Sequence, residues 1–267
     1  MIRVNCMRQV VGALCASLAI SGAQQPLWAE PPPSPLPRGG ENPALDRFGP
    51  AVVYYVGFEG HALAEIASGS PVPIGNDKWN AAVQTNTPPY EKGVYGQGIL
   101  SRDYQLTYNA TGPVMRASGT LALWLKARSL AHGYSYFWPA MLDAHASGYR
   151  VQFGRMGSRG NGETLYTYLG HGKNGTSATM GSMQSWKTEV WHLFVITWDR
   201  HGTAFSVDGA APARAFLRTP IGGEAAGGFR LYLLSPSDDT FIYDELLVLN
   251  LPLTAEEIKW MYAQGKP

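Results

Sequence analysis

The chain has 267 residues, of which 45% are hydrophobic, 12% aromatic and 15% charged, and its formal net charge is +1. This apolar and aromatic content excludes a chain that is disordered throughout, and the 31 Gly and 19 Pro residues argue against a coiled coil or a helical repeat. The small net charge gives no electrostatic reason to expect nucleic acid as a partner.

The first 29 residues have the pattern of a signal peptide. Arg3 and Arg8 give a positive start, residues 10–23 form an uncharged apolar run, and the segment 27–29, which ends in Ala29, suits cleavage by signal peptidase. The run is short for a transmembrane helix, which needs about 20 residues. We therefore expect a secreted or periplasmic protein with no membrane association after cleavage. An uncleaved anchor is the alternative.

The predicted signal also contains both cysteines, Cys6 and Cys15, so we expect a mature chain without disulfides or cysteine-based sites. Residues 30–50 contain seven prolines, a composition typical of an extended linker. The sequence thus predicts a signal peptide (1–29), a Pro-rich linker (30–50) and a single domain (51–267).

Short runs of β-forming residues recur between turn signals throughout the predicted domain. They cover residues 52–58, 119–125, 149–153, 164–169, 191–198, 203–207, 229–234 and 240–251. The run 191–198 is apolar on both faces and therefore predicts a central strand. One helix is expected near the C-terminus, where Thr254 and Glu257 form a capping box and Gly265 ends the helix. This pattern predicts an all-β sandwich or barrel.

Three motifs in order carry a family resemblance. They are residues 119–126, residues 191–199 followed by 205–209, and residues 243–250 leading into 252–258. The domain resembles the laminin-G-like, concanavalin A-like lectin/glucanase superfamily in its bacterial three-motif form. The resemblance implies an antiparallel two-sheet jelly-roll sandwich with a short C-terminal helix, in which the first strand pairs with the last.

Several residues of these motifs have an expected structural role. We expect Trp124, Trp191 and Trp198 to fill the space between the two sheets. Asp208 and the glycine after it predict a tight turn. The resemblance implies that His192 is a hydrogen-bonded structural residue.

The same superfold includes glycoside hydrolases, whose retaining members need two carboxyl groups about 5 Å apart. The resemblance implies that a glucanase would carry a Glu-x-Asp-x-x-Glu or Glu-x-Asp-x-Glu strand, and this spacing does not occur in the sequence. The neighbouring acids Asp244 and Glu245 are expected to face opposite sides of a strand. We therefore predict a non-catalytic binding module, with a divergent glycoside hydrolase or polysaccharide lyase as an alternative.

Calcium is the cofactor that the sequence suggests best. Glu59 ends the first predicted strand and Asp244 lies on the last. If the two strands are neighbours, these carboxylates converge, and backbone oxygens and water would complete a calcium shell. In the alternative interpretation, Asp244 caps a turn and Glu59 is solvated.

Aromatic residues suggest a carbohydrate as the partner, because sugar rings stack on flat aromatic surfaces. Strand alternation places Tyr134, Tyr136 and Trp138 on one face, and Tyr166 with Tyr168 on one face. If these faces are exposed, they would suit a glycan, whereas in the alternative they belong to the core. Trp186 lies between polar neighbours and is expected to be exposed. A protein-interaction or adhesion module is the alternative function.

Overall fold

A computed structural model describes residues 42–84, 89–100, 105–110, 118–129, 137–144, 149–157, 163–171, 173–182, 186–220, 229–233 and 240–265. All of these residues belong to one compact unit. No helix among them is long and apolar enough to cross a membrane.

The described residues form mostly strands. In chain order the elements are α1 (Pro43–Phe48), η1 (Gly49–Ala51), β1 (Val52–Val56), β2 (Ile66–Ala67), β3 (Ile74–Gly75), α2 (Asp77–Gln84), β4 (Tyr90–Lys92), β5 (Gln97–Leu100), β6 (Leu106–Ala110), β7 (Gly119–Ser129), β8 (Phe137–Ala144), β9 (Tyr149–Gly157), β10 (Glu163–His171), β11 (Asn174–Ser182), β12 (Trp191–Asp199), β13 (Gly202–Val207), β14 (Ala213–Phe216), β15 (Phe229–Leu233), β16 (Thr240–Leu249) and α3 (Ala255–Gly265).

Two antiparallel sheets contain these strands. The first sheet has the order β14-β13-β12-β7-β16-β1-β2, with β5 paired to β16 and β4 paired to β5. The second sheet has the order β11-β10-β9-β8-β15-β6-β3. The expected pairing of the first long strand with the last is confirmed, because β1 lies antiparallel to β16. The central position expected for residues 191–198 is also confirmed, since β12 lies between β7 and β13.

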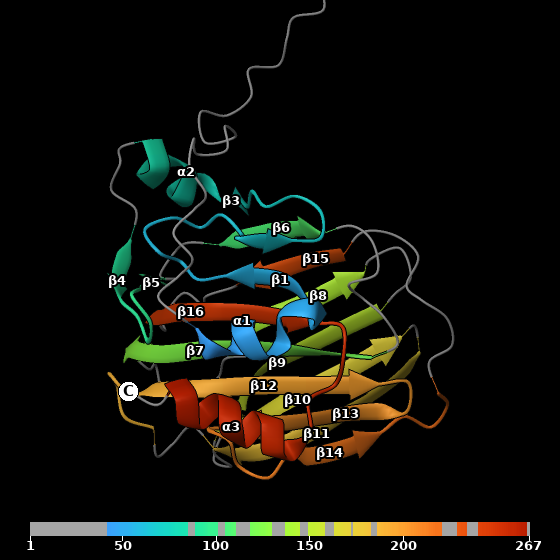
Figure 1. Ribbon diagram of the computed structural model, residues 1–267. Coiled ribbons are helices and arrows are strands. Elements are labelled where there is room, and N and C mark those ends of the chain that lie inside the picture. Colours follow the sequence, from blue (N-terminus) through green and yellow to red (C-terminus); the bar gives the residue numbers. More distant parts are fainter. Residues whose placement is uncertain are drawn as a thin grey trace, which may run out of the picture. The chain divides into compact units, whose positions relative to one another are not determined.

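The two sheets face each other across the main hydrophobic core (Figure 1). The first sheet contributes Phe194 and Trp198 to this core, and the second sheet contributes Val151, Phe153 and Leu165. Because neighbouring residues of a strand point to opposite faces, the intervening residues lie on the outer faces of the sandwich. The all-β, two-sheet sandwich predicted from the sequence is therefore confirmed.

The outer face of the first sheet carries a second core, which helices α1 and α3 cover (Figure 1). Trp124 and Trp191 belong to this second core, and the Trp124 ring stacks on Tyr262 of α3 at a centroid distance of 5.8 Å. The expectation that all three tryptophans fill the space between the sheets is thus wrong for these two. Only Trp198 does so, because alternation turns Trp124 and Trp191 toward the helices.

The predicted C-terminal helix and the predicted turn at Asp208 are present. Thr254 and Glu257 form the capping box, in which the Glu257 carboxylate accepts from the Thr254 backbone N–H at 2.8 Å. Residues 199–202 join β12 and β13 as a hairpin. Asp208 and Gly209 both have positive φ angles, of 54° and 69°, which is typical of a tight hairpin turn.

The domain begins earlier than the sequence suggested. Asn42 caps α1 by accepting the Ala44 N–H at 2.8 Å, and Ala44 and Phe48 are buried against α3 and the first sheet. Residues 42–50 therefore belong to the domain rather than to the expected linker 30–50. The prolines at the start of α1 and in η1 occupy first-turn positions, which helices tolerate.

Candidate functional site

The outer face of the second sheet presents an aromatic platform on β10. The expectation that Tyr166 and Tyr168 share a face is met, because they alternate with the buried residues Leu165 and Leu169. The half-buried Tyr168 pairs with Gln152 of β9 and with Ser177 of β11, and residues directly opposite share a face. Tyr168 therefore lies in the middle of a three-strand surface.

Two glycines let the Tyr168 ring lie flat on this surface. Gly170 and Gly175 are directly opposite each other on β10 and β11. A Cβ atom at either position would collide with the Tyr168 ring, and at Gly175 it would lie 2.5 Å from the Tyr168 hydroxyl oxygen. Ser177, opposite Tyr168, and Thr179, opposite Tyr166, have exposed side chains on the same face. The result is a flat aromatic ring on a face that also carries two exposed hydroxyl groups.

Gln152 adds an unsatisfied acceptor to the same face. Its Nε2 donates to the Tyr166 hydroxyl at 3.3 Å, whereas its Oε1 is buried and has no hydrogen-bond donor among the described residues. Gln152 is 7% exposed and Tyr166 is 9% exposed, so both are held firmly in place. A buried amide oxygen without a donor is costly. The sequence analysis missed Gln152, because a lone Gln carries no motif.

Among the other aromatic candidates, Trp186 is the one whose side chain the structure describes. Tyr134 and Tyr136 lie outside the described residues, and Trp138 lies on β8, where the structure describes the strand but not the side chain. Trp186 had been expected to be exposed, but it is half-buried. Its ring stacks on His192 at a centroid distance of 4.0 Å and meets Phe194 edge-on at 5.4 Å.

His192 has the structural role that the resemblance implied. Its Nδ1 lies 2.6 Å from Asp208 Oδ2, and Asp208 Oδ1 accepts the Leu193 N–H at 2.9 Å. The imidazole thus links the start of β12 to the turn after β13, with Trp186 stacked on it.

A second candidate site lies where β1, β5 and β16 meet, and it contains the two predicted calcium ligands. Asp244 Oδ2 accepts the N–H groups of Val94 and Tyr95 at 2.6 and 3.3 Å, and Glu59 Oε2 accepts the N–H of Gln97 at 3.2 Å. Both carboxylates therefore converge on the turn between β4 and β5, as expected for neighbouring strands. Asp244 is fully buried.

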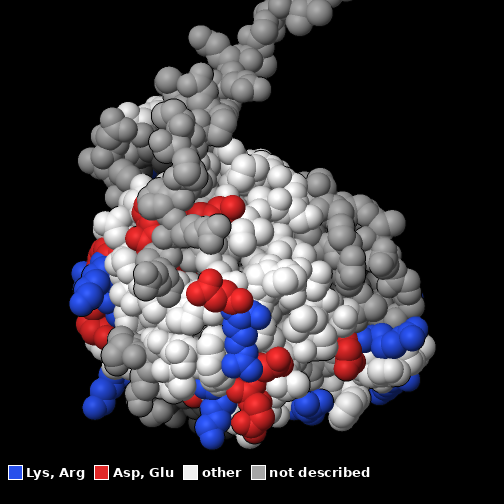
Figure 2. Space-filling model, viewed as in Figure 1, with Lys and Arg blue, Asp and Glu red and all other residues white. Residues whose placement is uncertain are grey.

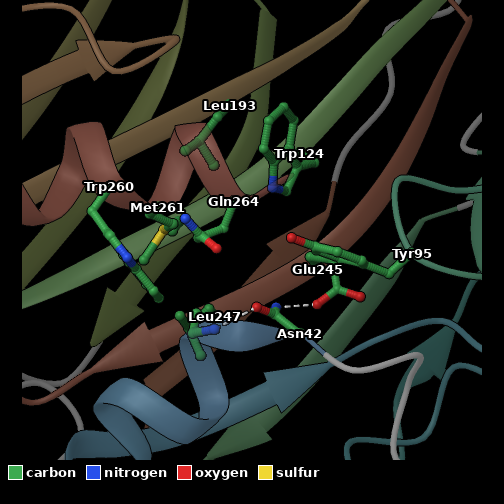
Figure 3. A pocket seen from close by; sticks show the side chains of 11 residues that line it. Asn42, Tyr95, Trp124, Leu193, Glu245, Leu247, Trp260, Met261 and Gln264 are labelled. Carbon is green, nitrogen blue, oxygen red and sulfur yellow. Dashed lines mark hydrogen bonds between the residues drawn. The ribbon is translucent and has the colours of Figure 1, made fainter. Parts of the chain in front are cut away.

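Glu245, the residue after Asp244, forms a buried polar cluster with Asn42 and Tyr55, and Figure 3 shows its hydrogen bond with Asn42. Its Oε2 accepts from the Tyr55 hydroxyl at 2.8 Å and from the Asn42 amide, whereas its buried Oε1 has no donor within the part of the chain that the structure describes. The register between β16 and β7 shifts between Asp244 and Leu247, and Glu245 has a φ angle of 55°. This β-bulge interrupts the strict alternation from which Asp244 and Glu245 had been expected to face opposite sides.

Burial and mutual repulsion raise the pKa values of these acids. Burial is the largest cause for Asp244, whose pKa lies well above its usual value, and the charges of Glu245 and Glu59 add to the shift. Burial also raises the pKa of Glu245 to about 8 and that of Glu65 to about 7, and in each case the charge of Glu59 adds to the shift. The cluster is therefore short of positive charge.

Backbone strain marks both sides of this cluster. Phe58, which is fully buried and precedes Glu59, has a φ angle of 59°, in a region that bulky residues rarely adopt. Glu245 shares this left-handed conformation. Strain of this kind persists where the surrounding structure holds residues in position, and it often accompanies functional sites. Among the described residues, however, no three His, Cys, Asp or Glu side chains are grouped so as to hold a metal ion by themselves.

Comparison with known families identifies the class of this protein. A family model described as the concanavalin A-like lectin/glucanases superfamily matches residues 101–259, which is more than half of the chain. The chain belongs to this superfamily, and the resemblance seen in the three motifs is confirmed. A comparison with curated protein sequences finds no significant match.

Solved structures share the fold at low sequence identity. The binding domain of botulinum neurotoxin DC in complex with SialylT is 7% identical, with a TM-score of 0.59 over 81% of this chain and 52% of that one. The binding domain of botulinum neurotoxin serotype D is 9% identical, with a TM-score of 0.57 over 82% of this chain and 53% of that one. This chain thus spans about half the length of the toxin domains.

Domain 4 of a GH43 extracellular arabinanase from Geobacillus stearothermophilus, in complex with arabinotriose, is similar over nearly its whole length. It is 14% identical, with a TM-score of 0.55 over 79% of this chain and 99% of that one. At these identities the likeness establishes the fold.

Proposed function

We propose that this protein is an exported, non-catalytic module that binds carbohydrate on the outer face of its second sheet. The observation that carries the proposal is the Tyr168 ring, which lies flat over Gly170 and Gly175 in the middle of three strands. The ring offers a stacking surface for the C–H face of a sugar. The exposed hydroxyls of Ser177 and Thr179 offer hydrogen bonds to sugar hydroxyl groups.

The structural neighbours support this class of ligand. The arabinanase domain is in complex with arabinotriose, and one of the neurotoxin binding domains is in complex with N-acetylneuraminic acid. Export is supported by the basic and then apolar pattern of residues 1–29. N-terminal sequencing of the protein recovered from its native host tests export, since the mature chain should begin near Glu30. A mature chain that still begins at Met1 would contradict export.

A binding assay on a glycan array tests the carbohydrate proposal, with arabinotriose and N-acetylneuraminic acid included as probes. We expect Tyr168→Ala to weaken the binding of a glycan that the wild type binds by about tenfold, or about 1.4 kcal/mol. Tyr168→Phe keeps the ring and should bind nearly as well as the wild type. Lys173→Ala is a control at an exposed residue just beyond β10. Equal affinity of wild type and Tyr168→Ala, or an array without any bound glycan, would contradict the proposal.

The proposal includes a structural calcium ion held by Glu59 and Asp244. The convergence of Glu59 and Asp244 on one turn supports such an ion, which would join the backbone N–H groups that both oxygens of Asp244 already accept. Backbone carbonyls and water would provide the remaining oxygens, as calcium sites commonly allow. When bound, the ion would supply the positive charge that the cluster lacks. The chain's own part is to hold the β4–β5 turn against β16 through the N–H contacts of both carboxylates.

Thermal unfolding in calcium and in chelator tests whether the protein binds a structural calcium ion. Calcium at about 100 times its dissociation constant stabilises a protein by about 2.7 kcal/mol. For a domain of this size that corresponds to a rise in Tm of roughly 5–10 °C. We expect Glu59→Gln to lose this rise, and the exposed control Glu256→Gln to retain it. A Tm that is the same in calcium and in chelator would contradict a calcium site.

A further inference from the structure

The helices leave one end of the first sheet's outer face open. α3 begins at Ala255, and a groove of about 250 Å³ lies between edge strand β14 and residues 252–255, which lead into the helix. Figure 1 shows this segment descending from β16 across β12 and β13 to the start of α3. The groove is on the opposite side of the sandwich from Tyr168, since Tyr168 lies on the outer face of the other sheet.

Small residues form the floor of the groove. Thr197 of β12 is paired with Ala204 of β13, and Asp199 is paired with Gly202. A Cβ atom at Gly202 would collide with the backbone carbonyl oxygen of Ala215. The glycine is therefore required for the approach of β14 to β13, and it leaves the sheet surface bare at the base of the groove.

Strand β14 gives the groove one wall with two different functional groups. Arg214 and Phe216 pair with Ala204 and Gly202, so both point to the face that carries the groove. Phe216 is 71% exposed, although soluble proteins usually bury large aromatic side chains, and the Arg214 side chain is also exposed. A sugar ring could stack on the phenyl face while the guanidinium binds a carboxylate or a sulfate in a two-pronged contact.

The strand segments at the end of the groove carry more basic than acidic side chains. The N–H of Leu217 donates to the carbonyl oxygen of His201 at 2.7 Å. This hydrogen bond brings Arg218 next to the β12–β13 turn. Residues 199–203 and 213–218 contain three exposed arginines, Arg200, Arg214 and Arg218, and one acid, Asp199. Figure 2 shows Lys and Arg side chains gathered at this lower right end of the molecule, with acidic atoms beside them.

Two of the nearby acids, Asp199 and Glu257, are held by contacts of their own, and a third, Glu256, is exposed at the start of α3. Asp199 Oδ1 accepts the N–H groups of His201 and Gly202 at 2.7 and 3.0 Å and so holds the β12–β13 turn. Glu257, in the first turn of α3, accepts from the N–H and the hydroxyl of Thr254. The second carboxylate oxygen of Asp199 can accept from a ligand hydroxyl. The groove thus combines an aromatic face, a guanidinium and a carboxylate acceptor around a bare floor.

We propose that this groove is a second binding site, independent of the Tyr168 platform, that takes one acidic sugar unit carrying a carboxylate or a sulfate. The aromatic ring of Phe216 contacts the sugar ring, and Arg214 contacts the anionic group. Arg200 and Arg218 raise the local concentration of anionic ligands, an effect that salt screens.

Amide chemical-shift mapping of the purified protein tests this proposal with three probes. They are digalacturonic acid for a carboxylate, a heparin-derived disaccharide for a sulfate, and lactose as a neutral sugar. We expect at least one acidic probe to shift the amides of Gly202, Ala215 and Phe216, with a dissociation constant of about 1 mM, a typical value for a weak single-unit contact. Lactose should bind at least about tenfold more weakly, and salt should weaken only the acidic probe.

Variants of groove residues and of matched control residues test which side chains contact the acidic sugar. Phe216→Ala and Arg214→Gln should each weaken the acidic probe by about tenfold, and neither should lower the Tm because both side chains are exposed. Ile74→Ala, at another exposed hydrophobic residue, and Lys187→Gln, at another exposed cation, should have no effect. Tyr168→Ala should also leave this binding intact, which separates the groove from the proposed function.

Three results would overturn the proposal. The first is that neither acidic probe shifts the groove amides at about 20 mM, well above the expected dissociation constant. The second is that the shifts persist unchanged in Phe216→Ala and Arg214→Gln. The third is that Tyr168→Ala abolishes them, because the acidic sugar would then bind at the platform and not in the groove.

Discussion

Replacement of Trp186 tests whether this ring stabilises the fold or contacts a ligand. The sequence suggested an exposed ring that contacts a glycan, whereas the structure packs it on His192 and against Phe194. An aromatic pair contributes about 0.5–1.5 kcal/mol beyond its buried area. With two such contacts on a half-buried ring, we expect Trp186→Ala to lower the free energy of unfolding by about 2 kcal/mol.

Chemical denaturation and glycan binding, measured on the same preparations, test this reasoning. Trp186→Phe keeps a stacking ring and should lose less than about 1 kcal/mol. Both variants should bind any glycan that the wild type binds within about twofold, a difference well below 1 kcal/mol. If Trp186→Ala kept full stability but lost binding by about tenfold or more, the ring would contact ligand and the argument would be refuted.

Three further variants test other parts of the account. Trp198→Ala should destabilise by about 3–5 kcal/mol in denaturation, because this fully buried ring fills the space between the sheets, and a loss below about 1 kcal/mol would be inconsistent with that position. Thr254→Ala should cost about 1 kcal/mol by removing the capping box of α3, and an unchanged Tm would argue against the cap. Gly175→Ala should weaken glycan binding even though Tyr168 is retained, because the new Cβ displaces the ring, and unchanged affinity would show that the flat pose does not matter.

The long strands could be predicted because their residues alternate or are apolar throughout. β12, for example, is apolar on both faces, and both faces are covered, one by the second sheet and the other by α3. Shorter strands such as β2 and β4, with two and three residues, are too short to show a period. β11 was missed because its residues are mostly small or polar, although its inward-facing Ala178 is buried.

Alternation indicates which residues share a face but not what lies against that face. This is why Trp124 and Trp191 were assigned to the wrong core, since nothing local in the sequence places α3 over them. The same limit applies to Trp186, whose polar neighbours suggested exposure while its packing depends on His192 and Phe194 of another element.

The candidate sites were predictable where adjacent strands bring residues together. The convergence of Glu59 and Asp244 follows from the pairing of β1 with β16, which the family motifs implied. The β-bulge at Glu245 and the role of Asn42 as its donor were not predictable, because they depend on a local register shift and on a contact between residues 203 positions apart.

The central claim is that carbohydrate binds on the outer face of the second sheet, and mapping a bound glycan onto the protein tests it most directly. We would titrate the labelled protein with arabinotriose, or with the strongest glycan found on the array, and follow the backbone amides. The account predicts that the largest shifts fall on Gln152, Tyr168, Gly170, Gly175 and Ser177, and that Tyr168→Ala removes them. Shifts confined to other parts of the chain, or shifts that persist in Tyr168→Ala, would contradict it.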